Sequence, residues 1–255
     1  MGYCSRTQAA ALIHAGRVTL NGRIARDPET PVRMPGGRMG SRVDAGIDDR
    51  IEVDGSPLGK TPSIYIIMNK PRGVVTTASD EQGRETVCDL LEPGMPWVGP
   101  VGRLDKASEG LLLLTNDSEW AAKITEPANH LGKKYHVQVD CVANADLVAR
   151  ITRGNAAAGD SIEGSSFVPD PGEHSRAKAA RILRHGDKNS WLEITLDEGK
   201  NRQIRRLLEA LGVRVLRLVR VSIGPLELGD LEKGSTRRLT LGEKKAVDRA
   251  LQKQV

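Results

Sequence analysis

Two carboxylic acids lie close together in the stretch VGRLDKASEGLLLLTND, residues 101–117. Asp105 follows a Gly-Arg-Leu segment, and Glu109 comes four residues later, shortly before a run of four leucines. Enzymes that break a glycosidic bond usually use a pair of carboxylic acids, because one can protonate the leaving group while the other acts on the sugar. Acids at this spacing are common in proteins, so the pair alone is weak evidence for a glycosidase.

Other common catalytic arrangements are missing from the sequence. The five histidines lie apart and do not have the HExxH spacing of zinc hydrolases. The three cysteines, Cys4, Cys88 and Cys141, are widely spaced and form no CxxC pair. Serine-nucleophile, P-loop and dinucleotide-binding motifs are also missing. We therefore expect chemistry that uses no metal and no small-molecule cofactor.

The composition favours a cytoplasmic protein of one or two domains. The chain has 255 residues and an odd number of cysteines, which fits a reducing compartment. No apolar run approaches the roughly 18 residues of a membrane-spanning helix, and the first residues contain none long enough for a signal sequence. We expect a monomer with no membrane association.

Basic residues are concentrated near the C-terminal third of the chain. Residues 199–220 contain seven lysines and arginines against a single acid, Glu209, whereas the whole chain has a net charge of only +5. Such a segment suits a polyanion such as RNA, although a solvated helix face would have the same composition. Only seven residues are aromatic, so binding by charge and shape is favoured over base stacking.

Local signals divide the chain into three parts. Ser5 and Gln8 form a capping box that predicts a helix ending at Gly16, and Asn21-Gly22 predicts a tight hairpin after it. A glycine- and proline-rich stretch follows. We expect an N-terminal helix-and-hairpin domain at 1–50, a linker with one short strand at 51–62, and the main domain at 63–255.

The main domain mixes strands and helices in an order that predicts an α+β fold with a largely antiparallel sheet. Buried or alternating strands are expected at 63–70, 73–77, 133–140, 190–199 and 213–228, the last with one wet, basic face. The clearest helix is NRQIRRLLEALG, with an apolar stripe that includes Ile204 and Leu208. A shorter helix, SEWAAKIT, is predicted directly after Asp117.

Four segments together resemble one enzyme family. GRLDKASEGLLLLTND resembles the active-site signature of the pseudouridine synthases, most closely the bacterial RsuA-type branch that modifies ribosomal RNA. MNKPRGVVTT, KKYHVQV and EGKNRQIRRLLEALGVRVLRLVRVSIGPLELGDLEKG follow the same family in order and spacing. CSRTQAAALIHAGRVTLNG is similar to the helix-and-hairpin part of the S4 RNA-binding domain, here without its usual first helix.

The resemblance implies a function and a set of site residues. It implies isomerisation of a uridine in ribosomal RNA without a cofactor, and it favours the large subunit over the small one. Asp105 would be the catalytic carboxylate, Tyr135 would lie against the flipped uracil, and Arg205 would pair with the aspartate. Arg103 would fill the space left by the flipped nucleotide. The remaining RNA contacts implied are Arg6, Arg17, Lys70, Lys200, Arg202, Arg206 and Arg217.

Other interpretations of these residues stay open at this point. Tyr135 also fits a tyrosine packed in an alternating strand, and Arg205 fits an exposed helix residue that pairs with Glu209. The whole chain also fits a ribosome-assembly factor that binds ribosomal RNA on the same fold without catalysis. A glycosidase would need Glu109 as much as Asp105.

Overall fold

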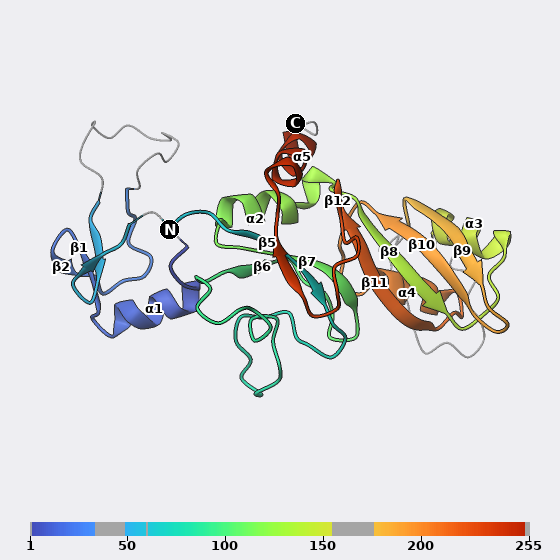
Figure 1. The fold of residues 1–255 in the computed structure, drawn as a ribbon, viewed down its shortest axis with the longest axis horizontal. Helices are drawn as coiled ribbons and strands as arrows, with labels where there is room; N and C mark the ends of the chain where they lie inside the picture. Colours follow the sequence, from blue (N-terminus) through green and yellow to red (C-terminus); the bar gives the residue numbers. More distant parts are fainter. Residues whose placement is uncertain (1, 34–48, 60, 155–175, 253–255) are drawn as a thin grey trace.

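The computed structural model describes residues 2–33, 49–59, 61–154 and 176–252, which form two sheets and their covering helices. A small four-stranded sheet with one helix lies at one end of the molecule, and a larger sheet with four α-helices makes up the rest (Figure 1). The larger sheet is mixed and mostly antiparallel, so the predicted α+β class is confirmed. No helix among the described residues is long and apolar enough to cross a membrane.

The N-terminal unit begins as its local signals predict. Helix α1 (Arg6–His14) starts at the Ser5–Gln8 capping box. The strands β1 (Val18–Leu20) and β2 (Arg23–Ile24) are joined by Asn21 and Gly22, which have φ values of 52° and 78°. A tight hairpin turn needs positive φ at both central positions, and glycine adopts it without strain.

The segment 51–62, expected to be a linker with one short strand, contains two short strands. Residues 51–57 form β3 (Ile51–Val53) and β4 (Ser56–Pro57), which complete the small sheet in the order β2-β1-β3-β4. The short alternating segment IEV bonds to β1 because β1 has an edge free for pairing beside the hairpin. The preceding glycine-rich residues at 34–48 lie outside the described part of the chain.

The larger sheet has the strand order β13-β5-β7-β11-β8-β10-β9, with β6 beside β7 and β12 beside β11. Its strands are β5 (Tyr65–Lys70), β6 (Gly99–Val101), β7 (Glu109–Thr115), β8 (Lys133–Val139), β9 (Ala179–His185), β10 (Ser190–Leu196), β11 (Val215–Ile223), β12 (Leu226–Glu227) and β13 (Thr236–Arg238). Strands β7 and β11 run parallel, and the other strand pairs are antiparallel. The strand expected at 73–77 is missing, since Val75 makes only an isolated bridge to Thr86.

Helices cover both faces of this sheet. They are α2 (Ser118–Thr125), α3 (Ala145–Arg153), α4 (Gln203–Ala210) and α5 (Leu241–Gln252), with a short 3-10 turn η1 (Pro127–Asn129). Helices α3 and α4 pack into one hydrophobic core and α2 and α5 into another. Asp117 caps α2 by accepting a hydrogen bond from the amide of Trp120, as its position predicts.

The four leucines of β7 are explained by these two cores. Leu112 and Leu114 lie in the core with α4, whereas Leu111 and Leu113 lie in the core with α2. Successive side chains of a strand point to opposite faces, so a strand covered on both sides reads as a continuous apolar run. The segment that carries Asp105 therefore leads into the rigid centre of the domain.

Candidate active site

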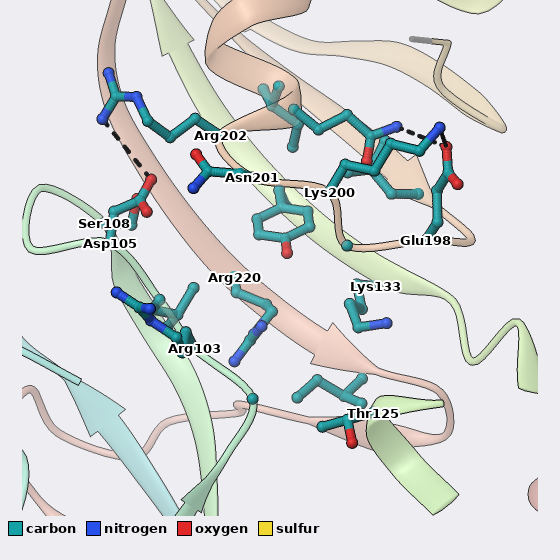
Figure 2. Close-up of a pocket in the computed structure, with 18 of the residues that line it drawn as sticks. Arg103, Asp105, Ser108, Thr125, Lys133, Glu198, Lys200, Asn201, Arg202 and Arg220 are labelled. Atoms are coloured by element: carbon teal, nitrogen blue, oxygen red, sulfur yellow. Dashed lines mark hydrogen bonds and ion pairs between the residues drawn. The ribbon is translucent and has the colours of Figure 1, made fainter. Parts of the chain in front are cut away.

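A pocket of about 610 Å³ opens where the loop before β7 faces β8, β11 and the segment that precedes α4 (Figure 2). A volume of this size suits a small-molecule or nucleotide-sized ligand. The polar and charged side chains that line the pocket are Arg103, Asp105, Ser108, Thr125, Lys133, Tyr135, Asp197, Glu198, Lys200, Asn201, Arg202, Gln203 and Arg220.

Asp105 lies at the rim of this pocket, in the loop between β6 and β7. Its side chain is 37% exposed, and Oδ2 lies 4.0 Å from Nη1 of Arg202. Figure 2 shows the Arg202 side chain reaching across to the carboxylate from the segment before α4. Arg202 has a φ of 49°, a left-handed conformation at the N-terminal end of α4.

The backbone of the Asp105 loop is held by an unbroken series of hydrogen bonds. Each of five successive carbonyls, from Leu104 to Ser108, accepts a bond from a group outside the loop. The donors are Thr76 Oγ1 to Leu104 (2.6 Å), Lys70 Nζ to Asp105 (3.2 Å), the amide of Gly73 to Lys106 (2.8 Å), Arg205 Nη2 to Ala107 (3.0 Å) and Lys70 Nζ to Ser108 (2.9 Å). Such a series fixes the direction of the Asp105 side chain, as a preorganised site requires.

Lys70 lies behind this loop and is fully buried, with an exposed fraction of 0%. Burial lowers the pKa of its ammonium group to about 8, although the nearby carboxylates of Asp105 and Glu109 act in the opposite direction. Its three acceptors are the carbonyls of Pro71, Asp105 and Ser108. The expectation that Lys70 contacts a phosphate is therefore wrong, because its ammonium group is enclosed by the protein.

Tyr135 and Arg220 stand side by side in the wall of the pocket. They are directly opposed residues of the antiparallel pair β8 and β11, so their side chains share one face of the sheet. Tyr135 is 8% exposed and Arg220 is 4% exposed. The sequence pattern predicted a wet face for the arginines of β11, and for Arg220 that prediction is wrong.

The sequence of residues 64–210 matches the family model described as RNA pseudouridylate synthase, and residues 1–38 match the S4 domain. A Bacillus subtilis (strain 168) protein named ribosomal large subunit pseudouridine synthase B is 34% identical over 96% of this chain and 90% of its own length. The chain belongs to the RNA pseudouridylate synthase family. It is therefore an RNA-modifying isomerase.

Two further comparisons extend over the whole synthase. An uncharacterised RNA pseudouridine synthase of Aquifex aeolicus (strain VF5) is 37% identical over 95% of this chain and 88% of its own length. A crystal structure described as a pseudouridylate synthase superposes with a TM-score of 0.58 at 26% identity, covering 98% of this chain and 94% of the other. The likeness includes both the N-terminal unit and the larger sheet.

The expected partner of Asp105 is only partly where the resemblance placed it. Among the described residues, the ion pair of Asp105 is made by Arg202, not by Arg205. Arg205 instead holds the loop through the carbonyl of Ala107, and desolvation is the main cause that lowers the pKa of its half-buried guanidinium. Arg202 precedes α4 and reaches the Asp105 carboxylate at the rim of the pocket. Arg205 lies within α4, and its guanidinium meets the backbone of the loop instead of the carboxylate.

The expected RNA contacts divide into those at the pocket and those away from it. Arg103, Lys200 and Arg202 line the synthase pocket. Arg206 lies on α4, half-buried, and is not a lining residue. Arg6 and Arg17 lie exposed on the small N-terminal unit, where Arg17 Nε donates to Asp54 at 2.9 Å.

Arg217 and Glu109 are also outside the pocket. Arg217 donates to Glu109 through Nε at 2.7 Å and through Nη2 at 2.9 Å, and Lys233 Nζ lies 2.7 Å from the same carboxylate. The hydrogen bond from Arg217 is the largest cause that lowers the pKa of Glu109 to about 2. The Arg217 side chain is 41% exposed although its guanidinium is engaged with Glu109, so its expected contact with an RNA phosphate stays a prediction.

No group of three or more His, Cys, Asp or Glu side chains in the described part of the synthase is placed to hold a metal ion. Arg220 and Lys133 are two basic residues of the pocket that the sequence did not assign to the site. A basic residue that alternates with valine and leucine looks like an exposed strand residue until the covering elements are known. The cross-strand register with Tyr135 is the signal that could have identified Arg220, and register is set by the fold.

Proposed function

We propose that the chain converts a specific uridine of large-subunit ribosomal RNA to pseudouridine, with Asp105 as the catalytic carboxylate. The observation that carries this proposal is the position of Asp105, held by its clamped loop at the rim of the pocket that contains Tyr135. The name of the Bacillus subtilis relative supports the large subunit as the source of the substrate. We further propose that the enzyme acts in the cytoplasm as a monomer and without a cofactor.

The reaction requires three changes at one nucleotide. The bond from ribose C1′ to N1 of uracil breaks, the uracil turns, and a bond forms from C1′ to C5. Positive charge develops on the ribose during cleavage, and a fixed carboxylate such as Asp105 stabilises it or bonds to the sugar. An enclosed pocket also keeps water from the reacting carbon, since hydrolysis would leave an abasic site.

The uridine must leave the RNA stack to enter the pocket. Arg103 is an exposed lining residue two positions before Asp105, and its planar guanidinium suits the space that the flipped nucleotide vacates. The exposed side chains of Lys200 and Arg202 are placed at the pocket to contact phosphates of the strand. Arg6 and Arg17 would contribute further phosphate contacts from the N-terminal unit.

The glycosidase interpretation loses its second carboxylate in this geometry. Glu109 is 3% exposed, is paired with Arg217 and Lys233, and does not line the pocket. A carboxylate engaged in this way has no access to a substrate at Asp105. Isomerisation needs one carboxylate, so the geometry favours the synthase.

The test of the proposed function is release of tritium from ribosomal RNA labelled at C5 of uracil. We expect the wild-type protein to release tritium and Asp105→Ala to reduce the rate by at least about 1,000-fold. Thermal unfolding of both proteins checks that the variant is folded. Undiminished release by a folded Asp105→Ala protein would refute the assignment of Asp105, and no release by the wild type would favour the assembly-factor interpretation.

The target nucleotide can be found separately. Carbodiimide treatment of ribosomal RNA followed by reverse transcription gives a stop at each pseudouridine. A strain that lacks this protein should lose one stop in the large-subunit RNA, and the lost stop identifies the uridine. A stop lost from the small-subunit RNA instead would contradict the proposed substrate.

A further inference from the structure

Arg220, in the inner part of the pocket, forms no ion pair with a carboxylate of the described residues. Arg220 is 4% exposed, and its Nε donates to the carbonyl of Leu111 at 2.8 Å. Its Nη2 atom is buried and has no hydrogen-bond partner, and no ion pair in the described part of the chain involves its guanidinium. An arginine buried in this way is costly unless an anionic or hydrogen-bond-accepting ligand completes its contacts.

A second cation lies close to Arg220. Lys133 lines the same pocket and is half-buried, and its Nζ has a hydrogen bond to the carbonyl of Leu131 at 3.2 Å. Desolvation and then the charge of Arg220 lower the pKa of the Lys133 ammonium, so the two groups are near enough to repel each other, although the carboxylate of Asp197 acts in the opposite direction. Figure 2 shows the Arg220 guanidinium directed into the pocket between Arg103 and Lys133.

The carboxylates that line the pocket form their ion pairs with other cations than Arg220. Asp197 pairs with Lys178 at 2.9 Å, Glu198 pairs with Lys200 at 3.1 Å, and Asp105 lies beside Arg202 at the rim. The pocket therefore has a negative group at its mouth and an excess of positive charge deeper in. That separation of charge matches the separation of charge that a breaking glycosidic bond creates.

We propose that Arg220, supported by Lys133, contacts the detached uracil and stabilises the negative charge on it. This inference rests on the proposed function. When the C1′–N1 bond breaks heterolytically, its electron pair goes to N1 and is delocalised onto O2 and O4, while the ribose becomes positive. The electrons then form the C1′–C5 bond, C5 loses its proton to solvent, and N1 takes up a proton, so atoms and charge balance. Arg220 would hold the anion during its rotation.

The depth of Arg220 favours the base over a phosphate as its ligand. Phosphates stay on the RNA strand, at the rim where the exposed Arg103 and Arg202 lie. Arg220 is opposite Tyr135 across the strand pair, and both are nearly buried. A uracil that reached Tyr135 would bring its carbonyl oxygens within reach of the neighbouring Arg220.

The experiment compares two substrates in one variant. Arg220→Gln and wild type are assayed under single-turnover conditions on large-subunit ribosomal RNA made with uridine or with 5-fluorouridine, and loss of the starting nucleoside is followed by nuclease digestion, chromatography and mass spectrometry. With fluorine at C5 no proton can leave that carbon after the C1′–C5 bond forms, so the product keeps its fluorine and adds water across N1=C6. Fluorine at C5 stabilises the uracil anion by induction, so it reduces the need for Arg220. We expect a rate loss of about 100-fold on uridine and a loss roughly tenfold smaller on 5-fluorouridine. The ratio of the two losses does not depend on the fraction of folded enzyme.

Matched variants complete the test. Arg220→Lys keeps a positive charge and should lose less on uridine than Arg220→Gln. Arg214→Gln removes an exposed arginine of the same segment, with a side chain 77% exposed, and should convert both substrates at the wild-type rate. Equal losses on both substrates, or a rate loss that disappears at saturating enzyme concentration, would overturn the role of Arg220. A wild-type protein that converts neither RNA would overturn the proposed function itself, and this inference with it.

Discussion

Replacement of Lys70 by methionine tests whether catalysis needs the hydrogen bonds that hold the Asp105 loop, here called the loop clamp, in addition to Asp105 itself. The Lys70 ammonium donates to the carbonyls of Pro71, Asp105 and Ser108 at 3.0, 3.2 and 2.9 Å. Methionine fills a similar volume and cannot donate, so the Asp105 loop would lose its donors from β5. A displacement of about 1 Å at a catalytic group costs on the order of 100-fold in rate. We therefore expect Lys70→Met to lower the rate of tritium release by about 100-fold.

The stability of the Lys70→Met protein should change much less than its activity. Hydrogen bonds to charged groups contribute about 1.5–3 kcal/mol each. Burial of the ammonium opposes this gain, since a pKa lowered from 10.5 to about 8 corresponds to about 3 kcal/mol. The carbonyl of Asp105 also keeps a bond from the amide of Ser108. We expect a net loss of about 1–3 kcal/mol in the free energy of unfolding, measured with urea.

The pH dependence of stability and of activity gives a second test of the role of Lys70. The pKa of Lys70 is lower in the folded protein than in the unfolded chain, so the unfolded chain binds more protons between about 8 and 10.5. The free energy of unfolding should therefore rise with pH over this range, relative to Lys70→Met. Activity should fall over the same range, because a neutral amine has two N–H groups for three carbonyls.

The control is Lys106→Met, which removes an exposed lysine from the same loop and leaves its backbone bonds in place. It should keep activity within about threefold of the wild type. If folded Lys70→Met released tritium as fast as Lys106→Met, the clamp would have no catalytic role and the argument from the loop would fail.

Two other substitutions separate the roles of neighbouring residues in β7. Glu109→Gln should reduce the free energy of unfolding at pH 7 by about 1–3 kcal/mol, since Arg217 and Lys233 are partly exposed and water screens the pairs. This difference in the free energy of unfolding should vanish as the pH falls from about 4.5 towards 2. Tritium release at pH 7 should fall far less in Glu109→Gln than in Asp105→Asn. Equal losses of activity in the two variants would support the glycosidase interpretation. Gly110→Ala should lower the free energy of unfolding by about 1–3 kcal/mol and slow tritium release, because φ is 102° and a Cβ would lie 2.3 Å from the carbonyl oxygen of Arg220. Unchanged urea unfolding and an unchanged rate would contradict the close approach of the β7 and β11 backbones.

Local signals in the sequence predicted those parts of the fold that depend on neighbouring residues. The capping box at Ser5, the turn at Asn21-Gly22 and the apolar stripe containing Leu208 each satisfy their own geometry within a few residues. One short strand was expected in residues 51–62, and β3 lies there, but β4 was not expected because a two-residue strand carries almost no periodicity. Their pairing depends on β1, which lies some 30 residues earlier.

Burial of basic residues was the main feature that the sequence could not predict. Lys70 and Arg220 are both charged and were expected in contact with solvent, yet they are 0% and 4% exposed. Isolated buried charges are unfavourable, so sequence patterns place lysine and arginine outside by default. Here backbone carbonyls satisfy Lys70, and the pocket gives Arg220 a ligand-facing position. Only the three-dimensional arrangement of the loop and the strands could show either environment.

The same strand pair fixes both charges that the proposed reaction needs. Gly110 follows the loop of Asp105 and is paired with Arg220 in the parallel register of β7 and β11. Because the position has no Cβ, the two backbones approach closely and set the distance between the negative rim and the positive interior of the pocket. Charges fixed by a rigid backbone need no reorganisation when the glycosidic bond breaks. A site made in this way can stabilise a positive ribose and a negative uracil at once, which one carboxylate alone cannot do.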